Sequence, residues 1–324
     1  MGKGALARVS IDGQRLSDGR ITYPMNARTL RLIINGKAAG AEGLREGVEF
    51  LRKAGHRVEV RVTWEQGDAN RWVVESQEEV VVAVGGDGTV HEVVQGLMDR
   101  PAGHRPALGI VPMGTANDFA NGCGLPLDLP GALDLCANGA LVPIDVARAN
   151  DRWFINAACS GFGAEVTANT PLELKRLLGG AAYTVMAALL AINFKPAQGR
   201  LVLPEGELHG SSVVAIIGNG RQTGGQPVTP KALINDGLLD VLVIREVPAS
   251  GLLQAARELQ ALEPDGEYIF YRQAPWVEFH PDHPMPINLD GEPVDFDCVR
   301  CEVVPEALRL IVPPDCPALA PARV

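Results

Sequence analysis

The sequence predicts two domains, an α/β domain with an open, mostly parallel sheet and a mainly antiparallel β-sandwich domain after it. Three observations carry this prediction. The chain of 324 residues is long for one hydrophobic core. Apolar strand patterns alternate with helical patterns up to about residue 141, which is typical of a parallel sheet covered by helices. Beyond that point, short alternating runs are broken by glycine, proline and asparagine, which indicates antiparallel strands.

The change of pattern places a domain boundary near residues 135–150. We therefore expect an α/β domain over residues 27–145 and a β-sandwich over 146–304. Residues 1–26 are polar and weakly periodic, and they are interpreted as an N-terminal extension with Met25 as an alternative start. Residues 305–324 are expected to form a C-terminal tail that returns to the first domain.

The elements of the first domain follow from the spacing of apolar residues. Strands are expected at residues 30–34, 58–63, 80–84 and 108–111, and helices at 41–54, 68–79 and 89–96. Gly55 is expected to end the first helix. Strand and helix alternate along the chain, as a parallel sheet requires.

One segment of the second domain departs from the strand pattern. Residues 172–194 read as a helix broken at Gly179 and Gly180, with Lys175 and Arg176 beside an apolar second half. Packing on the sheet is the favoured interpretation, and contact with a membrane surface or an acyl chain is the alternative.

A glycine-rich loop follows the expected strand at residues 80–84. It reads Gly85-Gly86-Asp87-Gly88-Thr89 and opens the next helix. Three glycines let the backbone approach a ligand closely, and the first amides of a helix have no partners of their own. This combination indicates an anion site, most simply for phosphate. The spacing fits neither the P-loop nor the dinucleotide fingerprint.

Asp87 is the unexpected residue of this loop, because a carboxylate repels a phosphate unless a cation or a donor lies between them. A magnesium ion removes that objection. A glycine-rich turn that binds nothing would leave Asp87 unexplained.

A second strand is also followed by a glycine-containing turn and a helix. The strand at residues 108–111 leads into Gly114-Thr115-Ala116-Asn117-Asp118 and a short helix. Ligands of open α/β sheets bind where such strand ends meet, so the two loops are expected to border one crevice. Asn117 and Asp118 can instead be helix caps only.

Composition excludes several classes of function. The net charge of −10 leaves no basic face for broad binding to nucleic acid. No apolar run reaches the ~18 residues of a membrane span, and no secretory signal is visible at the N-terminus. We therefore expect a cytoplasmic protein whose contact with a membrane is peripheral. The six scattered cysteines are expected to be free thiols.

Four blocks, in order, carry a resemblance to a known family: GGDGTVHEVVQGL, GIVPMGTANDFA, PKALINDGLLDV and NLDGEP. Together they resemble the diacylglycerol-kinase catalytic-domain family, in particular the bacterial YegS-type lipid kinases, over about residues 31–305. The GGDGT block alone is shared with NAD kinases and is similar to that of phosphofructokinases.

The resemblance implies an ATP-dependent kinase that acts on a lipid hydroxyl in an interdomain cleft. Its pattern assigns the nucleotide contacts to Thr63, Gly85, Gly86, Asp87, Gly88, Thr89, Val90, His91 and Thr115. It also implies a structural Mg²⁺ or Ca²⁺ held by Asp236 and the carbonyls of Leu233 and Leu238, and it makes Glu292 the proton acceptor. His91 departs from the pattern, because asparagine is common at that position.

The residues themselves agree with phosphoryl transfer, which needs a phosphate cradle, a divalent ion and a group that takes the hydroxyl proton. Asp87, and with it Asp118, are candidates to hold the Mg²⁺ of the nucleotide. Either Asp290 or Glu292 supplies the base, since Gly291 between them can send the two carboxylates to different tasks. Lys37 is a candidate to approach the phosphates.

The predicted function is an ATP-dependent lipid kinase that phosphorylates a hydroxyl of a membrane lipid. Phosphatidylglycerol, diacylglycerol and sphingoid bases all offer such a hydroxyl. Two other functions use the same glycine loop, a small-molecule kinase of the NAD-kinase type and a non-catalytic nucleotide sensor. A sensor needs no base, so the carboxylates at Asp290 and Glu292 argue against it.

Overall fold

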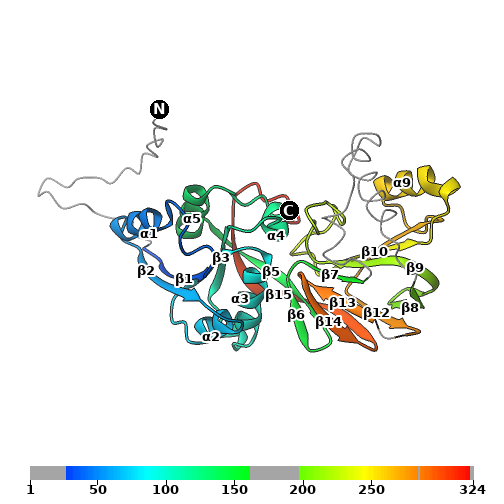
Figure 1. Cartoon of the computed structure of the whole chain (residues 1–324), viewed down its shortest axis with the longest axis horizontal. Helices are drawn as coiled ribbons and strands as arrows, with labels where there is room; N and C mark the ends of the chain where they lie inside the picture. The colour runs from blue at the N-terminus through cyan, green and yellow to red at the C-terminus, as the bar shows by residue number, and fades with distance from the viewer. Residues whose placement is uncertain (1–26, 161–196, 284, 322–324) are drawn as a thin grey trace, which may run out of the picture.

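A computed structural model of the chain describes residues 27–160, 197–283 and 285–321. The expected extension at residues 1–26 and the expected helix at 172–194 lie outside these ranges. The described residues form two halves side by side along the long axis of the molecule (Figure 1). The first half is α/β and the second is a β-sandwich, so the predicted fold class is confirmed.

The first half contains a parallel sheet in the order β2-β1-β3-β4. Its strands are β1 (Thr29–Asn35), β2 (Arg57–Thr63), β3 (Val80–Gly85) and β4 (Ala107–Pro112). β3 and β4 are buried along their whole length, as the unbroken apolar runs predict. All four strands end at the same edge of the sheet.

Helices cover both faces of this sheet. The helical elements are α1 (Leu44–Lys53), α2 (Asp68–Val74), α3 (Asp87–Met98), the 3₁₀ turn η1 (Ala102–His104), α4 (Asp118–Gly122) and α5 (Leu129–Asn138). α1 and α5 share a buried cluster with one face, through residues such as Leu51 and Leu133. α2, α3 and α4 pack on the other, through Val73, Val93 and Phe119.

α2 is shorter than the sequence predicts, because it ends at Val74 and not at Glu79. The guanidinium of Arg100 lies against its carboxyl end and donates to the carbonyl oxygens of Val73, Val74 and Ser76 at 2.6–3.0 Å. A cation at this end satisfies carbonyls that would otherwise continue the helix. This contact comes from 24 or more residues away and has no local signal.

Strands dominate the second half. They are β5 (Ala140–Ala149), β6 (Arg152–Phe154), β7 (Ala157–Ser160), β8 (Ala197–Leu203), β9 (Gly206–Gly218), β10 (Leu239–Arg245), β11 (Ile269–Ala274), β12 (Trp276–Pro281), β13 (Met285–Leu289), β14 (Glu292–Phe296) and β15 (Val299–Val312). Their pairings with one another are antiparallel.

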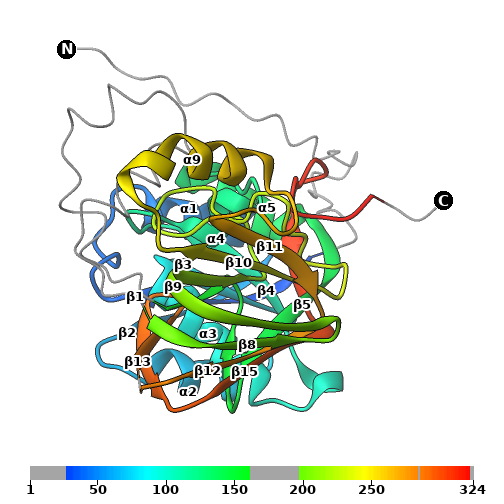
Figure 2. The same cartoon turned by 90° about the vertical axis from the view of Figure 1, so that its right-hand side faces the viewer.

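The two layers of the sandwich enclose an apolar core that includes Phe154, Val241 and Val277. β9 joins the layers, because its first part pairs with β8 and its second part with β10 and β7. The 3₁₀ turn η2 (Ala249–Gly251) and helix α9 (Leu252–Ala261) follow β10. α9 covers the outer face of the β10–β11 layer (Figure 2). Neither α9 nor β11 is among the elements predicted from the sequence.

A two-stranded ribbon joins the halves. β5 and β15 pair along almost their whole length, and β15 also pairs in parallel with β4 at Leu310 and Leu108. The register of the ribbon shifts between Val304 and Leu308. The expected boundary between residues 145 and 146 lies inside β5, and the expected tail at 305–324 begins inside β15. Sheet hydrogen bonding therefore runs from one half into the other.

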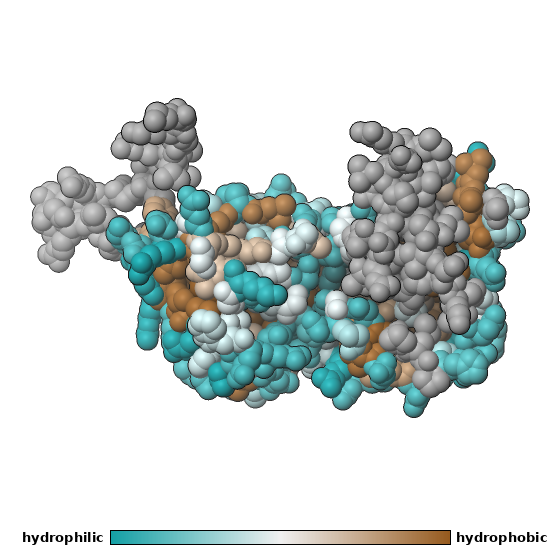
Figure 3. Space-filling model, viewed as in Figure 1, coloured by the Kyte–Doolittle hydropathy of each residue, from teal (hydrophilic) through white to brown (hydrophobic). Residues whose placement is uncertain are grey.

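The face in Figure 3 is mostly hydrophilic, with hydrophobic residues in separate patches over both halves. Within the described ranges, no helix is both long and apolar enough to cross a membrane.

Candidate active site

Two loops in backbone contact form the floor of the candidate site. β3 and β4 are neighbours, and the loops that follow them meet at Gly86 and Gly114. A Cβ atom on Gly114 would lie 2.6 Å from the Cα of Gly86, closer than real Cβ contacts allow. The amide group of Asn117 bonds both the N–H and the C=O of Gly114, at 2.8 and 3.0 Å. The structure thus brings the two strand ends into contact, while the residues that line the neighbouring cavity come from the loop after β3 and not from the loop after β4.

The glycine loop presents the amino end of α3 to this crevice. The Gly86 carbonyl accepts the N–H groups of Thr89 and Val90 at 2.9 and 3.1 Å, which starts the helix. The preceding amides, at Asp87 and Gly88, have no carbonyl one turn back to bond. With the helix dipole behind them, they form a site suited to an anion.

Thr89 and Val90 have structural tasks in the same turn. The Thr89 hydroxyl accepts a hydrogen bond from Asn35 Nδ2 at 3.2 Å and packs so closely on Gly85 that a Cβ there would lie 2.3 Å from it. Val90 is 4% exposed and belongs to the core. The side chain of Val90 therefore faces away from the crevice.

A cavity of about 270 Å³ lies between the halves, above this turn. It is lined by Asn35, Thr63, Ala69, Gly86, Gly88, Thr89, Glu92 and Glu292. Seven of these residues come from the first half, and only Glu292 comes from the second. A Cβ on Gly88 would lie 3.7 Å from Glu292 Oε1, so this carboxylate faces the first turn of α3 directly.

Glu292 and Asp290 belong to the same hairpin, but their side chains have different surroundings. β13 and β14 are joined by Asp290 and Gly291 alone, with φ of 50° and 101°, as in the type I′ turn that favours Asp-Gly. The Asp290 carboxylate accepts the N–H groups of Ile155, Asn156 and Ala157 at 2.9–3.0 Å. Glu292 is exposed at the start of β14. The two carboxylates therefore have different surroundings, as the sequence allows across Gly291.

His91 adds a fourth partner to Asp290 and joins the halves. Its Nδ1–H donates to Asp290 Oδ2, with 3.1 Å between the nitrogen and the oxygen. Burial would lower the pKa of the His91 imidazole, but the hydrogen bond to Asp290 and the charges of Asp290 and Glu292 outweigh burial and raise that pKa. The side chain of His91 is thus held by the second half, and it does not line the cavity.

Negative charge accumulates around the crevice. Burial raises the pKa of the Asp87 carboxyl, and the charge of Asp118 adds to the rise. Burial also raises the pKa of Glu92, with the charge of Glu292 next in weight. Ionised carboxylates that lie close together repel one another, and a cation between them relieves that repulsion. This set of oxygen donors therefore fits a divalent ion.

Asp118 also connects the two halves. Its two oxygens accept the N–H groups of Gly224 and Gly225, both at 2.7 Å. It thus holds a turn of the second half against α4. The side chains of Asn117 and Asp118 both bond outside α4, so the alternative that they only cap this helix is wrong.

Two other candidates lie at the margin of the site. Thr115 is exposed in the loop after β4 and does not line the cavity. Lys37 is exposed too, and its backbone N–H bonds Asn35 Oδ1 at 3.0 Å.

The predicted turn at Asn235-Asp236-Gly237 is present in the second half. Gly237 has φ of 79°, and Asp236 Oδ1 accepts the N–H of Leu238 at 3.0 Å. Asp145, which the sequence analysis did not identify, accepts the N–H of Gly237 at 2.8 Å and is 1% exposed. Burial raises the pKa of Asp236, and the charge of Asp145 adds to the rise. This paired negative charge fits a hard cation.

Within residues 27–160, 197–283 and 285–321, no three His, Cys, Asp or Glu side chains gather as a metal site by themselves. A cation here would need backbone carbonyls, water or phosphate oxygens as further ligands.

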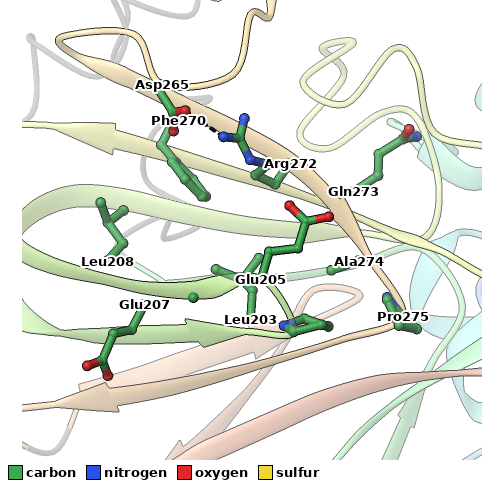
Figure 4. A pocket seen from close by; sticks show the side chains of 12 residues that line it. Leu203, Glu205, Glu207, Leu208, Asp265, Phe270, Arg272, Gln273, Ala274 and Pro275 are labelled. Carbon is green, nitrogen blue, oxygen red and sulfur yellow. Dashed lines mark hydrogen bonds and ion pairs between the residues drawn. The ribbon is translucent and has the colours of Figure 1, made fainter.

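A second cavity, of about 260 Å³, lies at the far end of the sandwich between the β8–β9 hairpin and β11 (Figure 4). It has an apolar floor that includes Leu203 and Phe270. Arg272 on its rim pairs with Asp265 at 2.5 Å. None of the predicted site residues lines it, so the cavity between the halves is the candidate active site.

Comparison with known proteins shows the family of this chain. Residues 29–149 match the model of the diacylglycerol kinase catalytic domain, and residues 156–312 match that of the YegS C-terminal NAD kinase beta sandwich-like domain. A protein of Chromohalobacter salexigens named "Probable lipid kinase YegS-like" is 46% identical over 287 residues, which are 87% of this chain and 92% of that protein. The chain belongs to the YegS-like lipid kinase family.

Other members of the family are similar over most of their length. The "Probable lipid kinase YegS-like" of Shewanella frigidimarina is 41% identical, with 90% of this chain and 96% of that protein covered. The fold alone also matches a crystal structure of a diacylglycerol kinase from Bacillus anthracis, at 24% identity and a TM-score of 0.71, over 89% of this chain and 98% of that one.

Proposed function

We propose that this YegS-like lipid kinase transfers the γ-phosphoryl group of ATP to a hydroxyl of a membrane lipid, such as phosphatidylglycerol or diacylglycerol, in the cavity between its halves. The observation that supports this best is the position of Glu292. Its carboxylate comes from the second half and faces the anion site at the first turn of α3. A proton acceptor and a phosphate cradle therefore border one cavity.

The cradle would bind phosphate through backbone groups. The amides of Asp87 and Gly88 open α3, and the contact of Gly86 with Gly114 fixes the loop that carries them. Amides held in place before the reaction need no reorganisation when charge develops on the transferred group. Thr63 and Asn35 line the continuation of the cavity along the sheet edge.

We propose Mg²⁺ as the metal of the reaction, held beside the phosphates by Asp87. When bound, this ion neutralises charge on the phosphate oxygens. The raised pKa of Asp87 reflects a buried carboxylate close to other acidic groups, and a cation would relieve that repulsion. Asp118 already uses both oxygens to bond Gly224 and Gly225, so we give it a positioning task.

A second cation, Mg²⁺ or Ca²⁺, is proposed for the turn at Asp236. The carboxylate of Asp236 and the carbonyls of Leu233 and Leu238 would hold it, with Asp145 contributing charge nearby. All these donors are oxygen atoms, which suit hard divalent ions.

We assign proton transfer to Glu292 and positioning to Asp290. A lipid hydroxyl is too weak an acid to ionise near neutral pH, so a carboxylate must take its proton as the new bond forms. Glu292 is exposed to the cavity, whereas Asp290 already accepts three backbone N–H groups and faces His91. Asp290 would therefore hold the hairpin from which Glu292 reaches the cavity.

The acceptor determines where the protein works. A lipid hydroxyl lies at the membrane surface and ATP is in the cytoplasm, so we propose a cytoplasmic enzyme that binds the membrane peripherally. The acidic net charge of −10 requires this contact to be local.

The proposal is tested with γ-labelled ATP, Mg²⁺ and detergent micelles that contain phosphatidylglycerol, diacylglycerol or a sphingoid base, with NAD as a soluble competitor acceptor. Label is expected in at least one lipid and not in NAD. Label in NAD alone would support a small-molecule kinase. Binding of ATP without any transfer would support a nucleotide sensor.

A further inference from the structure

An exposed tryptophan stands next to the cavity. Trp64 follows the last residue of β2, and its exposed fraction is 88%. In the described part of the chain, the next most exposed large apolar side chain is Leu127, at 54%. Tryptophan is highly buried on average, and a ring in water forfeits a large area of apolar contact. This exposure requires an explanation.

A loose loop does not explain it, because the backbone of Trp64 is anchored. Its N–H donates to Asp68 Oδ2 at 2.8 Å, and the N–H of Glu65 donates to the same oxygen at 3.2 Å. Asp68 is 5% exposed and bonds Arg71 at 2.5 Å. The first turn of α2 therefore fixes the point from which the ring extends.

Trp64 lies along the sheet edge where the base of a bound nucleotide would be expected. The cavity runs from Gly86 and Gly88, after β3, past Asn35 at the end of β1, to Thr63 at the end of β2. Neighbouring strands are ~4.8 Å apart, so the ends of β3 and β2 are about 10 Å apart with β1 between them. A nucleotide with its phosphates on α3 would extend along this row and bring its base to the side of Trp64.

We propose that Trp64 stacks on the base of the bound nucleotide. This inference rests on the proposed function and adds the residue that binds the base. The indole offers a flat apolar face at low cost in side-chain entropy, and aromatic stacking accepts any base because each has a π face. Trp64 therefore supplies affinity for the nucleotide beyond what the phosphate cradle gives.

The test measures equilibrium binding of Mg²⁺-ATP and of Mg²⁺-tripolyphosphate to wild type, Trp64→Ala and Trp64→Phe. Tripolyphosphate carries the phosphates without the base. Trp64→Ala is expected to weaken ATP binding at least about fivefold and to leave tripolyphosphate binding within twofold. Trp64→Phe keeps an aromatic face and is expected to lose less. ATP, and not tripolyphosphate, is expected to quench the additional fluorescence that wild type has over Trp64→Phe.

Phe50→Ala is the matched control. Phe50 is a 50% exposed aromatic residue of the same half, in the second part of α1. α1 runs back from the edge where the strands end, so Phe50 lies toward the opposite edge. Both ligands are expected to bind this variant as they bind wild type.

The other outcomes overturn the proposal in distinguishable ways. Unchanged ATP binding by Trp64→Ala, with reduced binding to phosphatidylglycerol vesicles, would make Trp64 a membrane contact. Equal losses for ATP and tripolyphosphate would mean that Trp64 only supports the loop. If wild type binds neither ligand, the proposed function fails, and the role of Trp64 fails with it.

Discussion

The two walls of the cavity are built from different parts of the residues. The wall from the first half uses its backbone for the anion site, since Gly86 and Gly114 bring two loops together and α3 offers its amides. The wall from the second half is a side chain, that of Glu292, on a tight hairpin whose turn contains Asp290. The first wall is therefore sensitive to added atoms, and the second is sensitive to lost charge.

The contrast continues inside the second wall. Asp290 accepts bonds from Ile155, Asn156 and Ala157 and is 3% exposed at its side chain, whereas Glu292 faces the cavity. Two carboxylates separated by one glycine thus have different surroundings, and we propose that one holds the wall and the other takes part in the reaction.

The largest expected effect comes from Asp87, the carboxylate of the glycine loop at the start of α3. Asp87→Ala is expected to lower the rate of lipid phosphorylation about 10³-fold, because the metal loses the side chain proposed to hold it. Circular dichroism and Tm are expected to match wild type. Activity near that of wild type would remove Asp87 from the mechanism.

A smaller effect is expected from an added methyl group on the same wall. Gly114→Ala forces the loops apart, because its Cβ would lie 2.6 Å from Gly86 Cα. Such overpacking costs about 1–3 kcal/mol of folding free energy, and we expect a lower Tm together with weaker binding of ATP and tripolyphosphate.

Gly103→Ala is the control for this methyl group. No atom lies within 4 Å of a Cβ placed on Gly103. If Gly114→Ala and Gly103→Ala gave equal Tm and equal ATP affinity, close backbone contact would not be what shapes the first wall.

Asp236→Ala tests whether the second half depends on a cation away from the cavity. Activation by added Mg²⁺ or Ca²⁺ is expected to weaken several-fold, with ATP affinity changed less. Asp282→Ala removes a carboxylate from an exposed loop and serves as the control. Superimposable metal titrations of Asp236→Ala and wild type would leave the turn without a metal.

The smallest effect is a pH dependence of the contact between the walls. The folded-state pKa of His91 is raised above 6.5, so its pairing with Asp290 contributes fully below pH 6.5 and is lost as the pH rises through the folded pKa. Between pH 6 and 9, the Tm of wild type is therefore expected to fall more than that of His91→Gln, by roughly 1–3 °C. Parallel Tm curves would show that the charge of His91 contributes nothing.

Much of the first wall could be predicted from the sequence, because its signals are local. A buried apolar run, a glycine cluster and the start of a helix are adjacent in the chain, and they mark both β3 and the loop after it. The parallel arrangement of β3 and β4 then brings the two loops together. The predicted end of α2 was wrong, because the guanidinium of Arg100, which is distant in the sequence, bonds the carbonyl oxygens at this end of the helix.

The second wall could be predicted only in part, because its contacts join distant residues. The Asp-Gly pair indicates a turn, but the partners of Asp290 lie 133–135 residues earlier. The bonds from Asp118 to Gly224 and Gly225 span 106 and 107 residues. Helix α9 was not predicted, because this surface helix contains no recognisable motif. The family resemblance favoured Glu292 as the base, and the hydrogen bonds of Asp290 add a physical reason.

The most direct test of the division between Asp290 and Glu292 is a paired measurement of Tm and of the lipid phosphorylation rate for Glu292→Gln and Asp290→Asn. Glu292→Gln is expected to keep the Tm and the ATP affinity of wild type and to lose at least ~10² in rate, because the amide cannot take a proton. Asp290→Asn is expected to lose at least about 2 kcal/mol of stability, because its amide NH₂ would face backbone donors. A rate within tenfold of wild type for Glu292→Gln, beside a stable but inactive Asp290→Asn, would contradict this division and make Asp290 the base.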